Sequence, residues 1–228
     1  MTQSFIEQSP KIIAVYTDPE GLTVQIALAV VTGMAVLIAL FQEKIKDFLN
    51  QVRLKLEINL QPPDCHQIDL SNNGQFVSKS IYLRIRVQNT SNSKTAMAVE
   101  VLMANLWKVQ RSGGKNTIVR TFLPMNLRWS HDHPTSTTIL PRSFKFCDLG
   151  PVRPFGDGVI LKLDTITQPN PVSNGKYPNV IEPGSYLFEL IISGDNVVPE
   201  KSYWNLSVPN KWSDNEKVML KRIKITKG

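Results

Sequence analysis

Residues that could bind a metal occur at three places in the chain. His131, Asp132 and His133 are consecutive, and the pairs Cys65-His66 and Cys147-Asp148 lie far from them in the sequence. Imidazole nitrogen and thiolate sulfur are ligands that zinc commonly takes in proteins. The candidate metal ligands are therefore His131, His133, Cys65, His66 and Cys147, if loops of the fold bring them together.

The spacing of these candidates fits no common zinc motif. His131 and His133 would share one face of a strand, but Pro134 indicates a loop instead. Neutral, unliganded histidines are the commoner finding in such loops, so we expect no cofactor and keep metal binding as the alternative. The only cysteines are Cys65 and Cys147, too few for a disulfide scaffold, and we expect a reduced pair.

Sequence motifs of the common enzyme classes are absent from the chain. It contains no G-x-S-x-G elbow, no phosphate-binding G-x-x-x-x-G-K-[ST] and no dinucleotide-binding G-x-G-x-x-G. The Ser112-Gly113-Gly114 run is typical of a hairpin turn. We therefore expect a protein that is not an enzyme.

An uncharged apolar stretch, Leu22 to Phe41, stands near the start of the chain. About 20 apolar residues in a helix span the hydrocarbon core of a bilayer. Asp18 is a suitable N-cap and Pro19 suits the first helical turn. We expect a retained transmembrane helix that contacts membrane lipid; a buried core helix and a cleaved signal peptide are the alternatives.

Basic residues on either side of this stretch predict its orientation. Lys11 precedes it, whereas Lys44, Lys46, Arg53 and Lys55 follow it. Loops rich in Lys and Arg stay in the cytoplasm. We expect the N-terminus outside and a large C-terminal domain inside.

Four segments follow from these patterns: a short N-terminal segment (1–21), the transmembrane helix (22–41), a helical extension (42–52) and one domain (53–228). Of 26 basic and 19 acidic residues in the chain, 25 and 16 lie after residue 41. Anionic lipid or nucleic acid would attract such a domain. A basic but otherwise ordinary solvated surface explains the charge equally, and nucleic acid is not an expected partner.

Alternating apolar residues after Val52 predict strands rather than helices. A helix is the alternative at Ala96–Val109, where good helix formers occur. Ser71-Asn72-Asn73-Gly74 predicts a turn, and Gln168–Pro183, which is rich in proline, predicts a long loop. Ser213 and Glu216 have the spacing of a capping box, which predicts a short helix ending near Lys221.

The predicted strands are Arg53–Leu60, Ile81–Gln88, Ala96–Val109, Thr117–Phe122, Asn126–Trp129, Phe144–Leu149, Val159–Leu163, Tyr186–Ile192 and Ser202–Val208. Short strands at such intervals are typical of a mainly β fold, an antiparallel immunoglobulin-like β-sandwich.

Two motifs near the C-terminus carry a resemblance to known proteins. Glu182 to Leu190 contains the "PG-x-Y" entry to a late strand of many immunoglobulin-like domains. Ile192 to Asn196, followed by Lys211 to Glu216, is similar to the ends of uncharacterised bacterial single-pass membrane-anchored proteins with such a domain. The resemblance covers about the last fifty residues. It implies a bacterial inner-membrane location and transfers no catalytic residue.

These observations predict a membrane-tethered interaction or scaffold module with a protein partner. Basic and aromatic residues interleave at Tyr82–Arg86, as in a nucleic-acid groove, but a strand with a basic outer face explains them better. Ala29 and Gly33 have the small-xxx-small spacing that lets transmembrane helices associate. The alternatives are a ligand- or metal-binding sensor and an outward-facing envelope- or carbohydrate-binding sandwich.

Overall fold

The computed structural model of the protein describes residues 19–109, 116–130, 135–172 and 175–228, with the backbone alone at 19, 20, 47, 48 and 72. The chain forms two compact units, Met1–Leu49 and Asn50–Gly228. The predicted N-cap Asp18, the Gly113-Gly114 turn and the His131–His133 run lie outside the described residues. The two units are described separately below.

The first unit contains one long helix, α1 (Pro19–Asn50). Its segment Gly21–Lys46 is long and apolar enough to cross a membrane, and none of it is buried. A signal sequence can meet the same criterion of length and composition. The polar Thr32 does not interrupt the apolar surface, because its hydroxyl donates to the carbonyl of Leu28 at 2.8 Å.

Helix α1 ends at Asn50, two residues before Val52, where the predicted helical extension ends. Val52 is 1 % exposed and forms a parallel bridge with Val197, so this residue belongs to the β unit. The backbone N–H of Val52 donates to the Asn196 carbonyl at 2.8 Å. Helical spacing in the sequence extended the prediction to Val52, but its side chain is buried in the core of the second unit.

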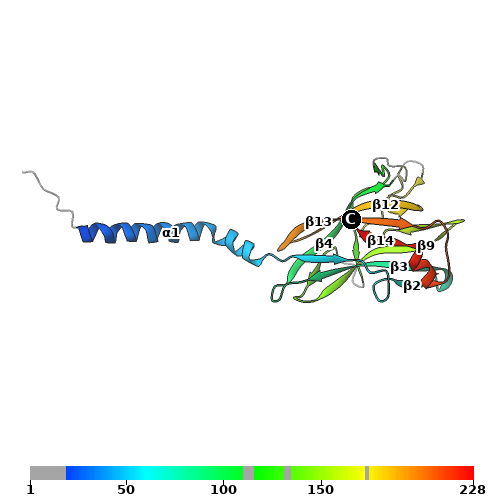
Figure 1. Ribbon diagram of the computed structural model, residues 1–228, viewed down its shortest axis with the longest axis horizontal. Coiled ribbons are helices and arrows are strands. Elements are labelled where there is room, and N and C mark those ends of the chain that lie inside the picture. Colours follow the sequence, from blue (N-terminus) through cyan, green and yellow to red (C-terminus); the bar gives the residue numbers. More distant parts are fainter. Residues whose placement is uncertain (1–18, 110–115, 131–134, 173–174) are drawn as a thin grey trace, which may run out of the picture. The chain divides into compact units, whose positions relative to one another are not determined.

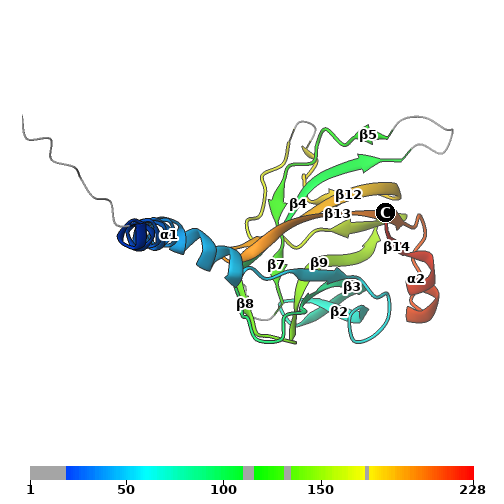
Figure 2. The ribbon, with the colours of Figure 1, turned by 60° about the vertical axis from the view of Figure 1, so that its left-hand side comes forward.

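The second unit is mainly β and consists of two antiparallel sheets, which Figure 2 shows as two layers. Sheet I has the order β1-β3-β9-β10-β11, with β2 and β7 at its margins, and sheet II has the order β14-β13-β12-β4-β5, with β6 and β8 beside β4. Sheet I consists of β1 (Leu54–Glu57), β2 (His66–Asn72), β3 (Gln75–Asn89), β7 (Arg128–Trp129), β9 (Phe144–Phe155), β10 (Gly158–Lys162) and β11 (Val180–Ile181). Sheet II consists of β4 (Ala96–Lys108), β5 (Thr117–Ile118), β6 (Met125–Asn126), β8 (Thr137–Ile139), β12 (Gly184–Gly194), β13 (Val197–Val208) and β14 (Lys224–Lys227).

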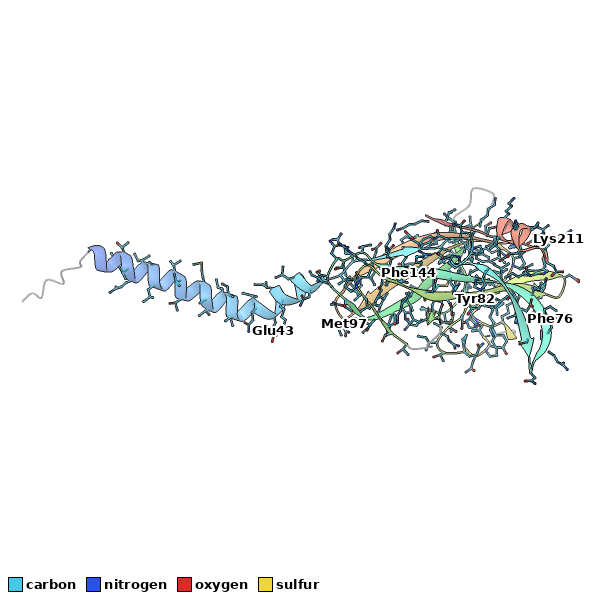
Figure 3. All side chains as sticks on the ribbon, turned by 90° about the horizontal axis from the view of Figure 1, so that it is seen from below. Glu43, Phe76, Tyr82, Met97, Phe144 and Lys211 are labelled. Carbon is cyan, nitrogen blue, oxygen red and sulfur yellow. The ribbon has the colours of Figure 1, made fainter. Side chains whose placement is uncertain are left out.

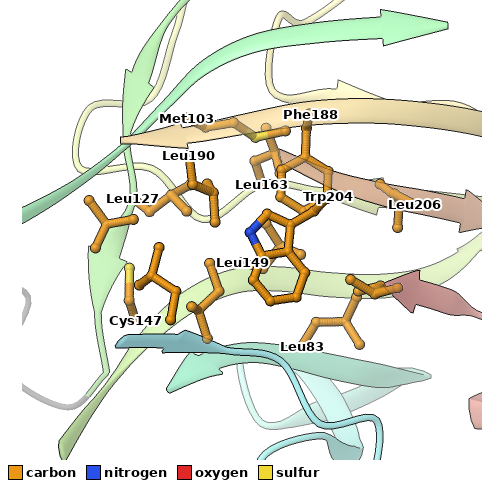
Figure 4. Close-up of a cluster of buried hydrophobic side chains, with 14 of the residues drawn as sticks. Leu83, Met103, Leu127, Cys147, Leu149, Leu163, Phe188, Leu190, Trp204 and Leu206 are labelled. Atoms are coloured by element: carbon orange, nitrogen blue, oxygen red, sulfur yellow. The ribbon is translucent and has the colours of Figure 1, made fainter. Parts of the chain in front are cut away.

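Alternation along the strands builds one core between the sheets. In β3 the side chains of Ile81, Leu83, Ile85 and Val87 are fully buried, while the residues between them are partly exposed. Leu149 of sheet I and Trp204 of sheet II lie close together in the interior (Figure 4). Burial of apolar side chains on the facing sides of both sheets is the main stabilising contribution to this unit.

The strand prediction at Ala96–Val109 is confirmed as β4, which pairs with β12 along most of its length. Four strands of the described residues were missed: β2, β8, β11 within the predicted loop, and β14. The Asn73-Gly74 turn was expected, and it joins β2 to β3 as a two-residue hairpin in which both residues have positive φ, at 50° and 78°. Positive φ at both positions is what a type I′ turn requires.

The capping prediction for the C-terminal helix is wrong in detail. Helix α2 (Glu216–Arg222) is capped by Asn215, whose side chain accepts from the Val218 N–H at 3.2 Å. The Glu216 carboxylate accepts instead from the backbone N–H of Gln67 at 2.8 Å. This bond links α2 to the start of β2, near which the helix lies in Figure 1. A contact with a distant strand took the place of the local capping bond.

Candidate functional site

A cavity of about 670 Å³ lies at one side of the two sheets of the β unit. Strands β4 and β12 of sheet II contribute to its wall, as do β9, β10 and β11 of sheet I. The wall is completed by Gln168, Gly175, Lys176, Tyr177, Glu182 and Pro183. Ligand pockets in proteins commonly have volumes of about 300–1,000 Å³. The cavity is therefore large enough for a small organic ligand.

One half of the cavity wall is apolar. Leu106 and Tyr186 line it from sheet II, and Val159 and Ile181 line it from sheet I. All four side chains are buried and belong to the hydrophobic core. Val119 adds a further apolar surface from the segment after β5. This half can accept an apolar group without unpaired polar atoms.

The other half carries positive charge. In the register of β9 and β10, Arg153 pairs with Ile160, while Val152 pairs with Leu161. Successive side chains of a strand point to opposite faces of a sheet. Val152 and Leu161 face the core, so Arg153, Ile160 and Lys162 lie on the outer face of sheet I. The cavity lining thus includes both buried apolar side chains and cations of the outer face of sheet I.

Arg153 contains an unpaired buried donor. Its Nε atom is buried and has no hydrogen-bond partner among the described residues. A buried N–H without an acceptor costs about 1–3 kcal/mol, so such groups need an explanation. An acceptor bound in the cavity would supply the missing hydrogen bond.

Besides Arg153, three charged side chains line the cavity: Lys162, Lys176 and Glu182. Lys176 Nζ forms an ion pair with Glu182 Oε1 at 2.7 Å, and both side chains are largely exposed. Because these two charges compensate each other, Arg153 and Lys162 give the lining an excess of positive charge. Burial and the nearby Glu182 raise the pKa of the Tyr186 phenol, so this group stays neutral at physiological pH.

The two cysteines predicted as metal ligands are both free thiols in the hydrophobic core. Cys147 on β9 pairs in register with Ile85 and with Trp129, and its side chain lies among Leu127, Leu149 and other apolar groups in Figure 4. Burial raises the pKa of Cys65 to about 11 and raises that of Cys147 well above its ordinary value. Both thiols are therefore poor metal ligands at neutral pH.

His66 lies at a different place from Cys147. Its Nδ1 is 3.3 Å from Nη2 of Arg84. Arg84 projects from the face of β3 opposite to Ile85, which is buried. Within the described ranges, no group of three or more His, Cys, Asp or Glu side chains could hold a metal ion. With His131 and His133 outside those ranges, the metal site stays an untested alternative.

A polar cluster contains Ser130, Asp148, Tyr82, Asp164 and Arg128. Ser130 donates through its hydroxyl to Asp148, and the Tyr82 hydroxyl donates to Asp164 Oδ2 at 2.6 Å. Arg128 Nε lies 3.5 Å from Asp164 Oδ1. Burial is the main cause that raises the pKa of Asp148, and burial together with the bond to Asp164 raises that of Tyr82.

Arginine and phenylalanine side chains form a ladder on the outer face of sheet I, where Figure 3 labels Tyr82 and Phe144. The guanidinium carbon of Arg84 lies 4.5 Å from the Phe146 ring centroid, and that of Arg86 lies 4.3 Å from the Phe144 centroid. Both guanidinium groups also bond to Asp64. These internal contacts explain the basic and aromatic residues of β3 without a nucleic acid. That the protein has no nucleic-acid partner stays a prediction.

The cavity residues were not candidates in the sequence. Arg153 stands between Val152 and Pro154, where nothing marks it as different from any surface arginine. The only local signal was the proline-rich segment, because long loops often carry binding residues. Only the register of β9 with β10 places Arg153 at the cavity.

No protein-family model, no curated protein and no solved structure matches this chain. The resemblance of the last fifty residues to bacterial membrane-anchored proteins therefore stays a prediction.

Proposed function

We propose that the protein is a membrane-tethered, non-catalytic binding module whose β unit holds a small ligand in the cavity beside β10 and β11. The observation that carries the proposal is this cavity of about 670 Å³, with an apolar half and a cationic half. A large pocket with a few convergent polar groups is the usual form of a ligand site. This favours the ligand-binding alternative over a module that only binds a protein, and the protein partner stays a prediction.

Occupation of the cavity can be tested by native mass spectrometry of the full-length protein, extracted from membranes in mild detergent. We expect a bound small molecule on the wild-type protein. The Thr121→Phe variant, which places a larger side chain in the cavity wall, should lack that molecule. Leu140→Phe is a matched control, because Leu140 is 62 % exposed and does not line the cavity. The same bound mass on all three proteins, or none on the wild type, would argue against the proposal.

Membrane tethering by α1 is part of the proposal. It is supported by the unburied apolar segment Gly21–Lys46. We expect the protein to stay in the membrane fraction during carbonate extraction. Release into the soluble fraction, or a mature protein that begins after Phe41, would contradict a retained anchor.

We also propose that the β unit faces the cytoplasm of a bacterium. The basic residues after the span support this orientation. A reporter fused after Gly228 should be active only on the cytoplasmic side. Lys44→Glu combined with Lys46→Glu should shift part of the population to the opposite orientation. A reporter active outside in the wild-type protein would favour the outward-facing alternative.

We further propose that the two sheets are an immunoglobulin-like sandwich. Strands β4, β12 and β13 are neighbours in the order of the C, F and G strands of that fold. Strands β1 and β3 correspond to A and B, but the β9–β10 pair has the reverse of the expected order. This reversed order departs from the strict immunoglobulin topology, so the proposed likeness is one of sandwich architecture.

A further inference from the structure

We propose that the ligand of this cavity is a single-chain anionic amphiphile, with its carboxylate or phosphate at Arg153 and Lys162 and its tail against the apolar half of the cavity wall. This inference rests on the proposed binding function and names the chemical class of the ligand. Three features of the cavity carry it: the unpaired donor of Arg153, the excess positive charge and the apolar half of the wall.

The unpaired donor requires an acceptor. Arg153 Nε is buried without a hydrogen-bond partner in the described part of the chain. An arginine presents several N–H groups in a planar fork that matches carboxylate and phosphate oxygens. A neutral ligand oxygen would satisfy the donor but would leave the charge of Arg153 and Lys162 uncompensated.

The positive charge is concentrated on one side of the cavity. Arg153 and Ile160 are direct cross-strand partners, and Lys162 lies two residues beyond Ile160 on the same face. Arg153 and Lys162 therefore lie on the same face of sheet I, both next to Ile160. Glu182 already pairs with Lys176 at 2.7 Å. An anionic group on the ligand would compensate the positive charge of Arg153 and Lys162.

The apolar half of the cavity wall favours a hydrocarbon tail. It includes Leu106, Val159 and Ile181, all of which are buried core residues, and Phe155, whose side chain is 66 % exposed. A polar ligand such as a sugar would leave its hydroxyl groups without partners there, at a considerable cost in free energy. An amphiphile with one tail satisfies both halves.

The test uses the full-length protein in phosphatidylcholine nanodiscs and a dodecanoate probe that carries a photoreactive diazirine on its tail. After illumination, mass spectrometry of peptides should locate the label on residues 153–162 or 180–186. Unlabelled dodecanoate and lauroyl lysophosphatidate should compete, and the stronger competitor identifies the carboxylate or the phosphate as the preferred head group. Dodecyltrimethylammonium, which has the same tail and the opposite charge, should not compete.

Variants assign the recognition to the proposed groups. Arg153→Met should reduce labelling of these peptides about tenfold or more, because a charge-assisted hydrogen bond is lost. Arg153→Lys keeps the charge but lacks the Nε–H and the planar fork, so it should retain only part of the labelling, and Thr121→Phe should abolish it. Arg142→Met is the matched control, since Arg142 is exposed, bonds to Asn92 and lies outside the cavity lining. Thermal unfolding of each variant verifies that it is folded.

Shorter tails provide an independent measurement. Each methylene removed from the competing carboxylate should weaken competition about fourfold, until the tail no longer reaches the apolar half. Equal competition by the cationic amphiphile, equal labelling of Arg153→Met and wild type, or label confined to α1 would overturn the inference. A neutral molecule found in the cavity by native mass spectrometry would leave the binding function in place and reject the anionic class.

Discussion

Arg86 Nη2 donates a hydrogen bond to Asp64 Oδ1 across 2.6 Å, in an ion pair whose acidic side chain is 2 % exposed. The second carboxylate oxygen of Asp64 accepts from Asn59 Nδ2 at 2.9 Å. The same guanidinium lies over the ring of Phe144. Asp64 therefore connects the loop before β2 to the outer face of β3, and its contacts position the neighbouring Cys65 in the core.

Replacing Asp64 should destabilise the β unit. In Asp64→Ala, Arg86 loses its buried partner, and we expect the free energy of unfolding to fall by about 3 kcal/mol. Urea unfolding followed by tryptophan fluorescence measures this unit selectively, because the four tryptophans of the chain lie after residue 100. Asp69→Ala, at an exposed position of β2, should change stability by less than about 0.5 kcal/mol. Equal midpoints for both variants would contradict this role of Asp64.

The pKa of Asp148 predicts a dependence of stability on pH. Burial is the main cause that raises this pKa above its ordinary value of 3.8, Asp164 adds to it, and the bond from Ser130 opposes it. Between the ordinary and the raised pKa the folded state binds more protons than the unfolded state, so stability falls as pH rises through this range.

The Asp148→Asn variant, which cannot ionise, should escape this loss. Its stability relative to the wild type should increase as pH rises above about 3.8 and should level off above the folded pKa. Unfolding midpoints measured from acid to neutral pH verify the prediction, with Asp69→Asn as the control. A difference that is constant over this range would show that Asp148 does not titrate as expected.

Both cysteines should resist modification in the folded protein. Cys65 and Cys147 are fully buried, and burial raises the pKa of each thiol, so little thiolate is present at neutral pH. Maleimide should label neither thiol at pH 7.5 but should label both in guanidinium. A cysteine introduced by Ser93→Cys, at an exposed loop position, should react rapidly under native conditions. Native labelling of Cys147 would mean that sheet I opens locally.

Gly150 should tolerate no side chain. Its φ is +123°, and a Cβ atom there would lie 2.1 Å from the backbone oxygen of Lys162. Because neither backbone can move away without breaking the sheet, Gly150→Ala should cost about 3 kcal/mol or more. Gly156, at φ +55°, has open space around it, so Gly156→Ala should cost only about 1 kcal/mol of backbone strain. Comparable losses in the two variants would show that the close approach at Gly150 is relieved by adjustment.

Much of the fold could be predicted from local pattern. The alternation in Ile81–Gln88 and Tyr186–Ile192 predicts strands with a buried side, and the structure confirms them as the C-terminal half of β3 and the central part of β12. The strand β14 could not be found, because Lys224 to Lys227 holds one buried residue, Ile225. This strand is stabilised by its pairing with β13, because its own sequence lacks a clear alternation of apolar residues.

The candidate site depends far more on tertiary structure. Cys65, His66 and Cys147 were selected by residue type, yet the alternation of β3 and β9 places His66 and Cys147 on opposite faces of sheet I. Arg153 has no distinguishing sequence pattern, and it becomes a candidate only because it pairs with Ile160 at the cavity.

The sequence by itself determined the properties that depend on neighbouring residues: the long apolar helix, the positions of the main strands and the Asn73-Gly74 turn. These follow from side-chain periodicity and backbone preference, which act over a few residues. Only the tertiary structure decided which strands pair, that Glu216 bonds to Gln67, and that Arg153 lies at the cavity with an unpaired Nε. Such contacts join residues far apart in the chain, and they form only when the sheets pack around a common core.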